Sequence, residues 1–188
     1  MNARRSRYTA MQHAVDTGDV ANLTMSDFDA LEFRSALGRF ATGVTIVTTV
    51  DAAGERYGVT ANSYNSVSLD PPLVLWSLAK TSRSIEAFEG CKAFAVHILG
   101  AHQEELAMRF ASPAADKFAG LDVHAGLHGV PLFEECAAHF ECTLENRFEG
   151  GDHVIFLGRV EHFARGDAAP LLFHDGKFAR VEASEKEA

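Results

Sequence analysis

The sequence has only three cysteines among its 188 residues, and no two of them form a C-x-x-C pair. Cys91, Cys136 and Cys142 are an odd number, which disfavours a disulfide framework and predicts reduced thiols. The absence of a C-x-x-C pair also argues against the common zinc-binding and dithiol redox motifs. Cys142 stands in an alternating strand pattern, which indicates a small core residue.

Long apolar runs and excess positive charge are missing too. No stretch of about 18 apolar residues could form a membrane helix. The basic start at Arg4, Arg5 and Arg7 is followed by Ala10 to Val20, a segment that polar residues interrupt, so a signal peptide is not predicted. The formal charge of −9, from 17 basic and 26 acidic residues, repels phosphate backbones and anionic lipid. We therefore expect a cytoplasmic protein that binds neither nucleic acid nor membranes.

Three nucleotide or nucleophile motifs are absent. The chain has no strand-linked G-x-G-x-x-G for a dinucleotide, no G-x-x-x-x-G-K phosphate loop and no G-x-S-x-G nucleophile elbow. His124 and His128 form an H-x-x-x-H, but they stand in a glycine-rich loop without a third ligand nearby, so no metal site is predicted.

The composition favours one folded domain, with 47% hydrophobic and 23% charged residues. We expect a flexible N-terminal arm at 1–25, the domain at 26–182 and a C-terminal tail at 183–188. The domain should open with a helix that has Ser26 as its N-cap and Phe33, Leu37 and Phe40 at helical spacing, with Gly43 as its stop.

Short β-rich segments dominate the rest of the domain. In the 138–146 segment Ala138, Phe140, Cys142 and Leu144 alternate with polar residues, which is typical of a half-buried antiparallel strand. Asp175-Gly176 indicates a hairpin turn, and 111–131 looks like a loop. The other predicted strands are 44–50, 57–60, 73–78, 92–99 and 153–163, and short helices are expected before Gly90 and over 101–110. This pattern predicts a mainly β, antiparallel barrel with a few short peripheral helices.

The stretch YGVTANSYNSVSLDPP, residues 57–72, is rich in small hydroxyl and amide groups but lacks a strong acid, base or nucleophile. Such groups suit the polar edge of a flat heterocycle, where donors and acceptors converge on one plane. A β-bend of turn-forming residues explains the same pattern about equally well. The residues alone leave both readings open.

Two further segments could contact a ligand. KTSRSIEAF places Arg83 and Ser84 at the start of a helix, where they could meet a phosphate, although ordinary N-capping also accounts for them. EGGDHVIF places His153 after a glycine turn with Asp152 beside it. A histidine in such a place is as often a polar surface residue without a function as a functional one. Arg109, at another predicted helix end, is a weaker candidate.

Taken together, these segments resemble the short-chain flavin reductase family, the split-barrel reductase components of two-component flavin-dependent monooxygenases. The matching phrases run in order from about Phe28 to Val181: FRSALGRFATGVTIVTT, GVTANSYNSVSLDPPLVLWSLAKTSRS, FAVHIL, RFASPAADKFAG, GGDHVIFLGRV and PLLFHDGKF. The resemblance implies an FMN-binding split β-barrel of the Greek-key type. It differs at Tyr64, where the family often has phenylalanine, and at His97, where asparagine is common.

The resemblance also implies roles for particular residues. His153, in the family's G-D-H motif, should be the catalytic residue on the nicotinamide side, with the aromatic Phe178 also binding nicotinamide. The residues expected to bind the flavin ring, ribityl chain or phosphate are Gly58, Val59, Thr60, Asn62, Ser63, Ser77, Leu78, Ala79, Arg83, Ser84, Arg109 and Phe110.

The activity that the resemblance implies is NAD(P)H:flavin oxidoreduction. A nicotinamide, NADH or NADPH, would give a hydride to FMN or FAD, and the reduced flavin would serve a separate monooxygenase. Flavin carries its own redox reactivity, which would explain a polar stretch without strong acids or bases. A homodimer is expected from the family. The alternatives are a flavin carrier or redox sensor on the same barrel, and a split-barrel oxidase that retains its flavin and acts on a small amine.

Overall fold

The computed structural model describes residues 29–182. The chain divides between Arg39 and Phe40 into two units, and each is described by itself. The predicted N-cap Ser26, the arm at 1–25 and the tail at 183–188 lie outside the described residues. Over residues 29–182, no helix has both the length and the apolar character needed to cross a membrane.

In the first unit, helix α2 spans Ala30–Leu37 and begins at Asp29. The Asp29 carboxylate caps it by accepting hydrogen bonds from the backbone N–H groups of Leu31 and Glu32. Gly38 is the C-cap, and its N–H donates to Arg34 O. The prediction that the helix reaches Phe40 and stops at Gly43 is therefore wrong, because the chain leaves the helix at Gly38, a residue that disfavours continuing a helix.

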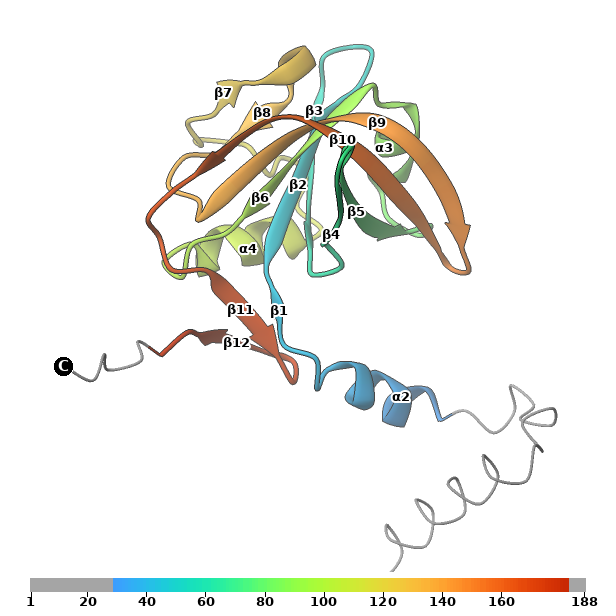
Figure 1. Cartoon of the computed structure of the whole chain (residues 1–188), viewed down its shortest axis with the longest axis vertical. Helices are drawn as coiled ribbons and strands as arrows, with labels where there is room; N and C mark the ends of the chain where they lie inside the picture. Colours follow the sequence, from blue (N-terminus) through green and yellow to red (C-terminus); the bar gives the residue numbers. More distant parts are fainter. Residues whose placement is uncertain (1–28, 183–188) are drawn as a thin grey trace, which may run out of the picture. The chain divides into compact units, whose positions relative to one another are not determined.

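The second unit is built on a seven-stranded antiparallel sheet in the order β3-β2-β6-β9-β10-β5-β4. Figure 1 shows the long β9 and β10 arching over the other strands of this unit. The strands are β2 (Thr45–Val50), β3 (Arg56–Ala61), β4 (Asn65–Leu69), β5 (Pro72–Ala79), β6 (Ala93–Ile98), β9 (Ala138–Gly150) and β10 (His153–Arg165). The prediction of a mainly β, antiparallel fold with few short helices is confirmed.

The remaining elements of this unit are short. β1 (Thr42–Gly43), β11 (Leu171–His174) and β12 (Lys177–Arg180) form a three-stranded sheet. Asp175 and Gly176 both have positive φ, 51° and 77°, as the predicted two-residue hairpin turn requires. The others are α3 (Ile85–Gly90), α4 (Glu104–Ala111), β7 (His124–Ala125), the 3₁₀ turn η3 (Leu127–Gly129) and β8 (Pro131–Leu132).

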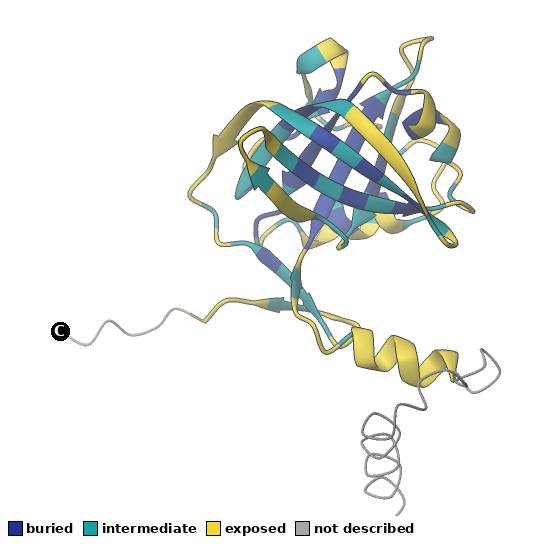
Figure 2. Cartoon of the chain, turned by 45° about the vertical axis from the view of Figure 1, so that its right-hand side comes forward, coloured by how far each residue is buried: buried dark blue, intermediate teal, exposed yellow. Residues whose placement is uncertain are grey.

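The core of the barrel is aromatic. Trp76 of β5 is fully buried and stacks on Phe156 of β10 at 4.9 Å between ring centroids. Phe88 of α3 meets Trp76 edge-on at 4.9 Å, and Phe94 of β6 does so at 6.0 Å. These contacts join α3 to the central strands, and Figure 2 shows the buried positions concentrated there. Helix α3 is therefore a fixed support for the turn that precedes it.

Two segments differ from the sequence prediction. β4 forms an edge strand inside the polar stretch, paired with β5 from Asn65 opposite Leu75 to Leu69 opposite Pro72. Glu141, predicted on the exposed face of β9, is buried. Its carboxylate accepts a hydrogen bond from the N–H of Leu127, because the 124–132 segment, expected to be a loop, folds over the outer face of β6 and β9.

Candidate flavin and nicotinamide site

A cavity of about 960 Å³ opens between β3, the turn before α3 and the segment that follows α4. Its size suits a drug-sized or nucleotide ligand. The residues that line it are 54–60, Leu78, 82–84 and 110–119. Three separated parts of the sequence thus meet at one hollow, and two of them carry the phrases YGVT and KTSRS.

Gly58 and the Phe110 ring, which both line the cavity, pack closely against each other. A Cβ atom on this glycine would lie 2.4 Å from Cε1 of Phe110, so only glycine lets the α4 end approach β3 this closely. The Lys117 ammonium then bridges the same two segments, donating to Phe110 O at 2.7 Å and to Gly58 O at 3.3 Å. Asp116 supports the turn by accepting from the N–H groups of Phe118 and Ala119.

Three cations, Arg56, Arg83 and Lys117, and two carboxylates, Glu55 and Asp116, line the cavity. Arg83 donates to Pro113 O at 3.2 Å, and Lys117 to the two carbonyls just named. Within residues 29–182 neither one forms an ion pair with a carboxylate. Burial, and then the neighbouring Arg83 guanidinium, lower the pKa of Lys117. Two cations that repel each other and pair with no carboxylate of residues 29–182 make this a place where an anionic group such as a phosphate would be stabilised.

Seven of the predicted flavin-binding residues line this cavity: Gly58, Val59, Thr60, Leu78, Arg83, Ser84 and Phe110. Some of their groups are already engaged. The Thr60 hydroxyl donates to Ala107 O at 2.6 Å, and the Phe110 ring is almost fully buried against the core. The Ser84 hydroxyl makes no capping bond to α3. Arg83, Ser84 and the backbone of β3 are therefore the groups still able to contact a ligand.

A second group of predicted residues lies on one face of the β5–β10 ladder. Ala79 pairs with His153, and Ser77 with Ile155, in the β5–β10 ladder. Residues that pair directly across an antiparallel ladder point to the same face, so His153, Ala79 and Ser77 share one face. Ser63 anchors its edge, because its hydroxyl both donates to Ser77 O at 2.9 Å and accepts from Ser77 N at 3.0 Å.

His153 is the first residue of β10 and is bonded to its neighbour. Its Nδ1 lies 2.7 Å from Asp152 Oδ1. The hydrogen bond and charge of His153 lower the pKa of the Asp152 carboxyl. The histidine side chain is 42% exposed, so it is open to a ligand on this face.

Three predicted residues lie elsewhere. Asn62 is exposed at the end of β3. Arg109 turns to Ala119 O, to which its guanidinium donates, and is not among the cavity-lining residues. Phe178, on β12, packs edge-on against Phe173 of β11.

Sequence reasoning did not single out Lys117, which lines the cavity. It stands in the phrase RFASPAADKFAG, but an isolated lysine in a loop gives no sign that it is half-buried or that it bonds to Gly58 O and Phe110 O.

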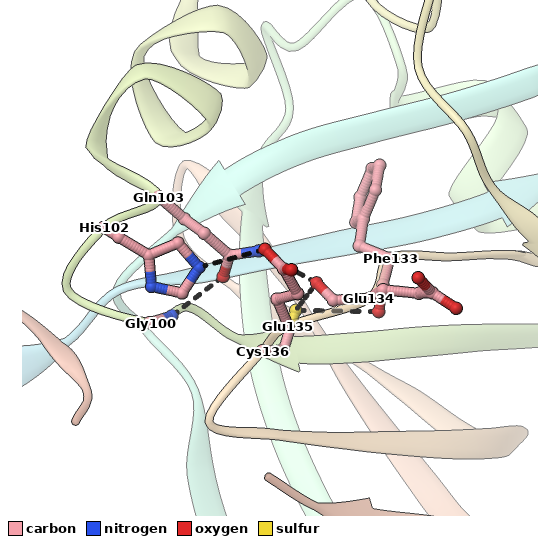
Figure 3. A network of polar contacts seen from close by, with 7 residues as sticks. All are labelled: Gly100, His102, Gln103, Phe133, Glu134, Glu135 and Cys136. Carbon is pink, nitrogen blue, oxygen red and sulfur yellow. Dashed lines mark hydrogen bonds and ion pairs between the residues drawn. The ribbon is translucent and has the colours of Figure 1, made fainter. Parts of the chain in front are cut away.

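A second cavity of about 570 Å³ lies where β9 begins and β10 ends. Figure 3 shows a polar network that includes some of its lining residues: Gln103 accepts from Gly100 N and donates to Glu134 O, and His102 pairs with Glu135. Phe133 in its wall stacks on Phe118, which lines the first cavity. Over residues 29–182 no cluster of three or more His, Cys, Asp or Glu side chains could hold a metal ion.

A protein-family model matches most of the chain. Residues 37–182 fit the model of the "Flavin reductase like domain". The chain belongs to this flavin reductase-like family. The resemblance drawn from the sequence motifs is thereby confirmed.

Other members of the flavin reductase-like family are similar over the same region. A probable flavin reductase of Rhizobium meliloti is 48% identical over 156 residues, which are 83% of this chain but 50% of that protein. The present chain thus spans half the length of that relative. The reductase subunit of a flavin-dependent monooxygenase from Rhodococcus jostii is 41% identical, over 88% of this chain and 85% of its own.

Solved structures of the family share the fold. The NADH:FAD oxidoreductase of Streptomyces globisporus, in complex with NAD and FAD fragments, has a TM-score of 0.79 and 39% identity. The match covers 84% of this chain and 96% of that one. The split-barrel fold expected from the sequence is therefore the fold of this chain.

Proposed function

We propose that this chain is an NAD(P)H:flavin oxidoreductase that transfers a hydride from a reduced nicotinamide to FMN or FAD. The observation that carries the proposal is the cavity lined by two cations, Arg83 and Lys117, that form no ion pair with a carboxylate of residues 29–182. Membership of the flavin reductase-like family supports it. So do relatives named as flavin reductases.

The residues fit a flavin nucleotide. Its phosphate is an anion, and Arg83 and Lys117 supply positive charge that pairs with no carboxylate of residues 29–182. The backbone of β3 from Gly58 to Thr60 offers polar groups to the edge of a ring. When bound, a flavin would supply the redox chemistry, because it can take up the hydride, which carries two electrons, that a reduced nicotinamide releases.

The protein's own contribution is to bind and to orient. Arg83 and Lys117 hold the charged end of the flavin, while Ser77 and Ala79 form a flat face of small residues on which a planar ring can lie. His153, on the same face, faces the nicotinamide. Hydride transfer needs close alignment of two rings more than a strong acid or base, so this set of groups is sufficient for the reaction.

We infer that reduced flavin passes to a second protein, a separate monooxygenase, because the Rhodococcus relative is the reductase subunit of such an enzyme.

We also propose that the chain forms a homodimer. Large apolar side chains are exposed on the barrel at Val67, Leu69, Phe148 and Phe163, with exposed fractions from 48% to 97%. A second copy would cover this apolar surface.

The test measures turnover for each combination of FMN, FAD or riboflavin with NADH or NADPH. The readout is the loss of absorbance of the reduced nicotinamide. The proposal predicts that at least one of the two nicotinamides is oxidised in the presence of flavin, with many equivalents of nicotinamide consumed per enzyme. Tight flavin binding without nicotinamide oxidation in any combination would instead identify a flavin carrier or redox sensor.

A further inference from the structure

A third cation, Arg56, lines the cavity at the beginning of β3. Successive residues of a strand point to opposite faces, so Arg56, Gly58 and Thr60 share one face of β3. This face meets α4, because the Thr60 hydroxyl donates to Ala107 O at 2.6 Å. A Cβ atom on Gly58 would likewise meet the Phe110 ring. Arg56 therefore extends the same face beyond Gly58.

The 111–116 loop forms the opposite wall of this outer part of the cavity. The contacts of α4 with β3 step backwards from Thr60 to Gly58, so the chain that leaves the helix continues toward Arg56. Lys117 brings the chain back, because its ammonium donates to Gly58 O at 3.3 Å. The loop thus begins and ends at the level of Gly58, and all six of its residues line the cavity together with Arg56.

The turn before Arg56 is held in place by Asp51. Its Oδ1 atom accepts hydrogen bonds from the backbone N–H groups of Ala53 at 2.8 Å and Glu55 at 2.9 Å. The Tyr57 hydroxyl donates to the second carboxylate oxygen at 3.3 Å. The backbone that carries Arg56 is therefore ordered before any ligand arrives, which lowers the cost of binding one.

The charges of the cavity exceed what one phosphate needs. Arg56 is exposed and, like Arg83 and Lys117, pairs with no carboxylate within residues 29–182. Of the two carboxylates in the lining, Asp116 accepts from two backbone N–H groups of its own turn. A single phosphate ester carries a charge of about −2 at neutral pH, which Arg83 and Lys117 match. Arg56 is then left for a second anionic group.

We propose that Arg56 is a specificity-determining residue that binds the second phosphate of FAD, so that the outer part of the cavity takes the adenylate half and the chain prefers FAD to FMN. This rests on the proposed function, which brings a flavin to this cavity. FMN has one phosphate and no adenylate, and it would leave Arg56 without a partner. The loop wall from Ala111 to Ala115 consists of small residues, which leave room for a flat base.

The preference is measured by binding, without turnover. Oxidised FAD and FMN are titrated separately into the full chain in the absence of nicotinamide, and the change in flavin fluorescence gives each Kd. The parent protein should bind FAD about tenfold more tightly than FMN, and Arg56→Ala should weaken FAD about tenfold while FMN changes less than about twofold. Equal affinities in the parent protein, or equal losses for both flavins in the variant, would overturn the proposal.

Two variants control for charge. Arg56→Lys keeps the cation and should retain most of the preference for FAD. Arg180→Ala removes the same charge from an exposed position on β12 that does not line the cavity, and it should change neither Kd. A loss of the FAD preference in Arg180→Ala would show that overall charge, and not Arg56, sets the preference, and the proposal would be wrong.

A nicotinamide dinucleotide is another source of phosphate, so KM for NADH and NADPH is measured in Arg56→Ala at saturating flavin. The proposal predicts that both values stay within about twofold of the parent. A raised KM for NADPH alone would assign Arg56 to the 2′-phosphate, and a raised KM for both would assign it to the nicotinamide pyrophosphate. Either result, with unchanged flavin affinities, would overturn the proposal. A parent protein that prefers FAD through Arg56 but oxidises no nicotinamide would instead defeat the proposed function and leave the FAD subsite standing.

Discussion

His97 provides a sharp test of the packing beneath the 124–133 segment. It is fully buried on β6, its Nδ1 lies 3.0 Å from Ile46 O, and within residues 29–182 its Nε2 has no hydrogen-bond partner. The Phe133 ring packs against it at 5.0 Å, and His139 stands opposite it in the β6–β9 ladder. A second proton on this ring would have no acceptor.

The consequence is a loss of stability in acid. Burial lowers the pKa of His97 from 6.5 to about 4. The unfolded chain takes up the proton below pH 6.5, whereas the folded protein does so only near pH 4, so the free energy of unfolding falls as the pH drops through this window. Across the whole window the free energy of unfolding falls by about 3 kcal/mol, and about 2 kcal/mol of this loss occurs between pH 7 and pH 5.

His97→Asn isolates this effect. An asparagine amide can still donate to Ile46 O, but it does not titrate, and the smaller side chain leaves a void that costs stability equally at every pH. Urea unfolding of both proteins at pH 5, 6 and 7 should show the parent losing about 2 kcal/mol more than the variant between pH 7 and pH 5. His162→Asn, at an exposed position on β10, is the control and should keep the parent's slope. Parallel pH dependence in the parent and His97→Asn would refute the reasoning.

Further predictions concern the cavity. Gly58→Ala should lower the free energy of unfolding by about 1–3 kcal/mol, because its Cβ would overlap Phe110; thermal unfolding checks this, and Gly43→Ala, with open space around it, should cost less. Arg83→Ala removes a charge-assisted contact of about 1.5–3 kcal/mol, so FMN should bind roughly ten- to a hundredfold more weakly while riboflavin changes little. Lys117→Met should show the same FMN-selective loss in a fluorescence titration, and equal losses for riboflavin would exclude a phosphate contact.

The strands could be predicted because their patterns are local. Alternation in β9, the β-branched run of β2 and the Asp175-Gly176 turn each report a backbone conformation within a few residues. β4 was not recognised, since its polar sequence NSVSL resembles a bend. The burial of Glu141 was not predictable either, because it depends on a segment that folds back over β9 from earlier in the chain.

Motif phrases pointed to Gly58, Arg83 and His153 as site residues, and their roles stay a prediction. The structure places Gly58 and Arg83 in the lining of one cavity, and His153 opposite Ala79 in the β5–β10 ladder. The sequence could not show that the hydroxyls of Thr60 and Ser63 bond to the protein's own backbone. Such partners come from other strands and helices, and no local pattern reports them.

Anaerobic reduction of bound flavin tests directly whether this chain transfers a hydride from a nicotinamide to a flavin. The protein is mixed with one equivalent of FMN or FAD, and NADH or NADPH is added in a stopped-flow instrument while flavin absorbance is followed. The account predicts that the flavin band bleaches as one nicotinamide is oxidised per flavin, at a rate that saturates with nicotinamide concentration. A flavin that stays oxidised in the bound state with both nicotinamides would contradict the account.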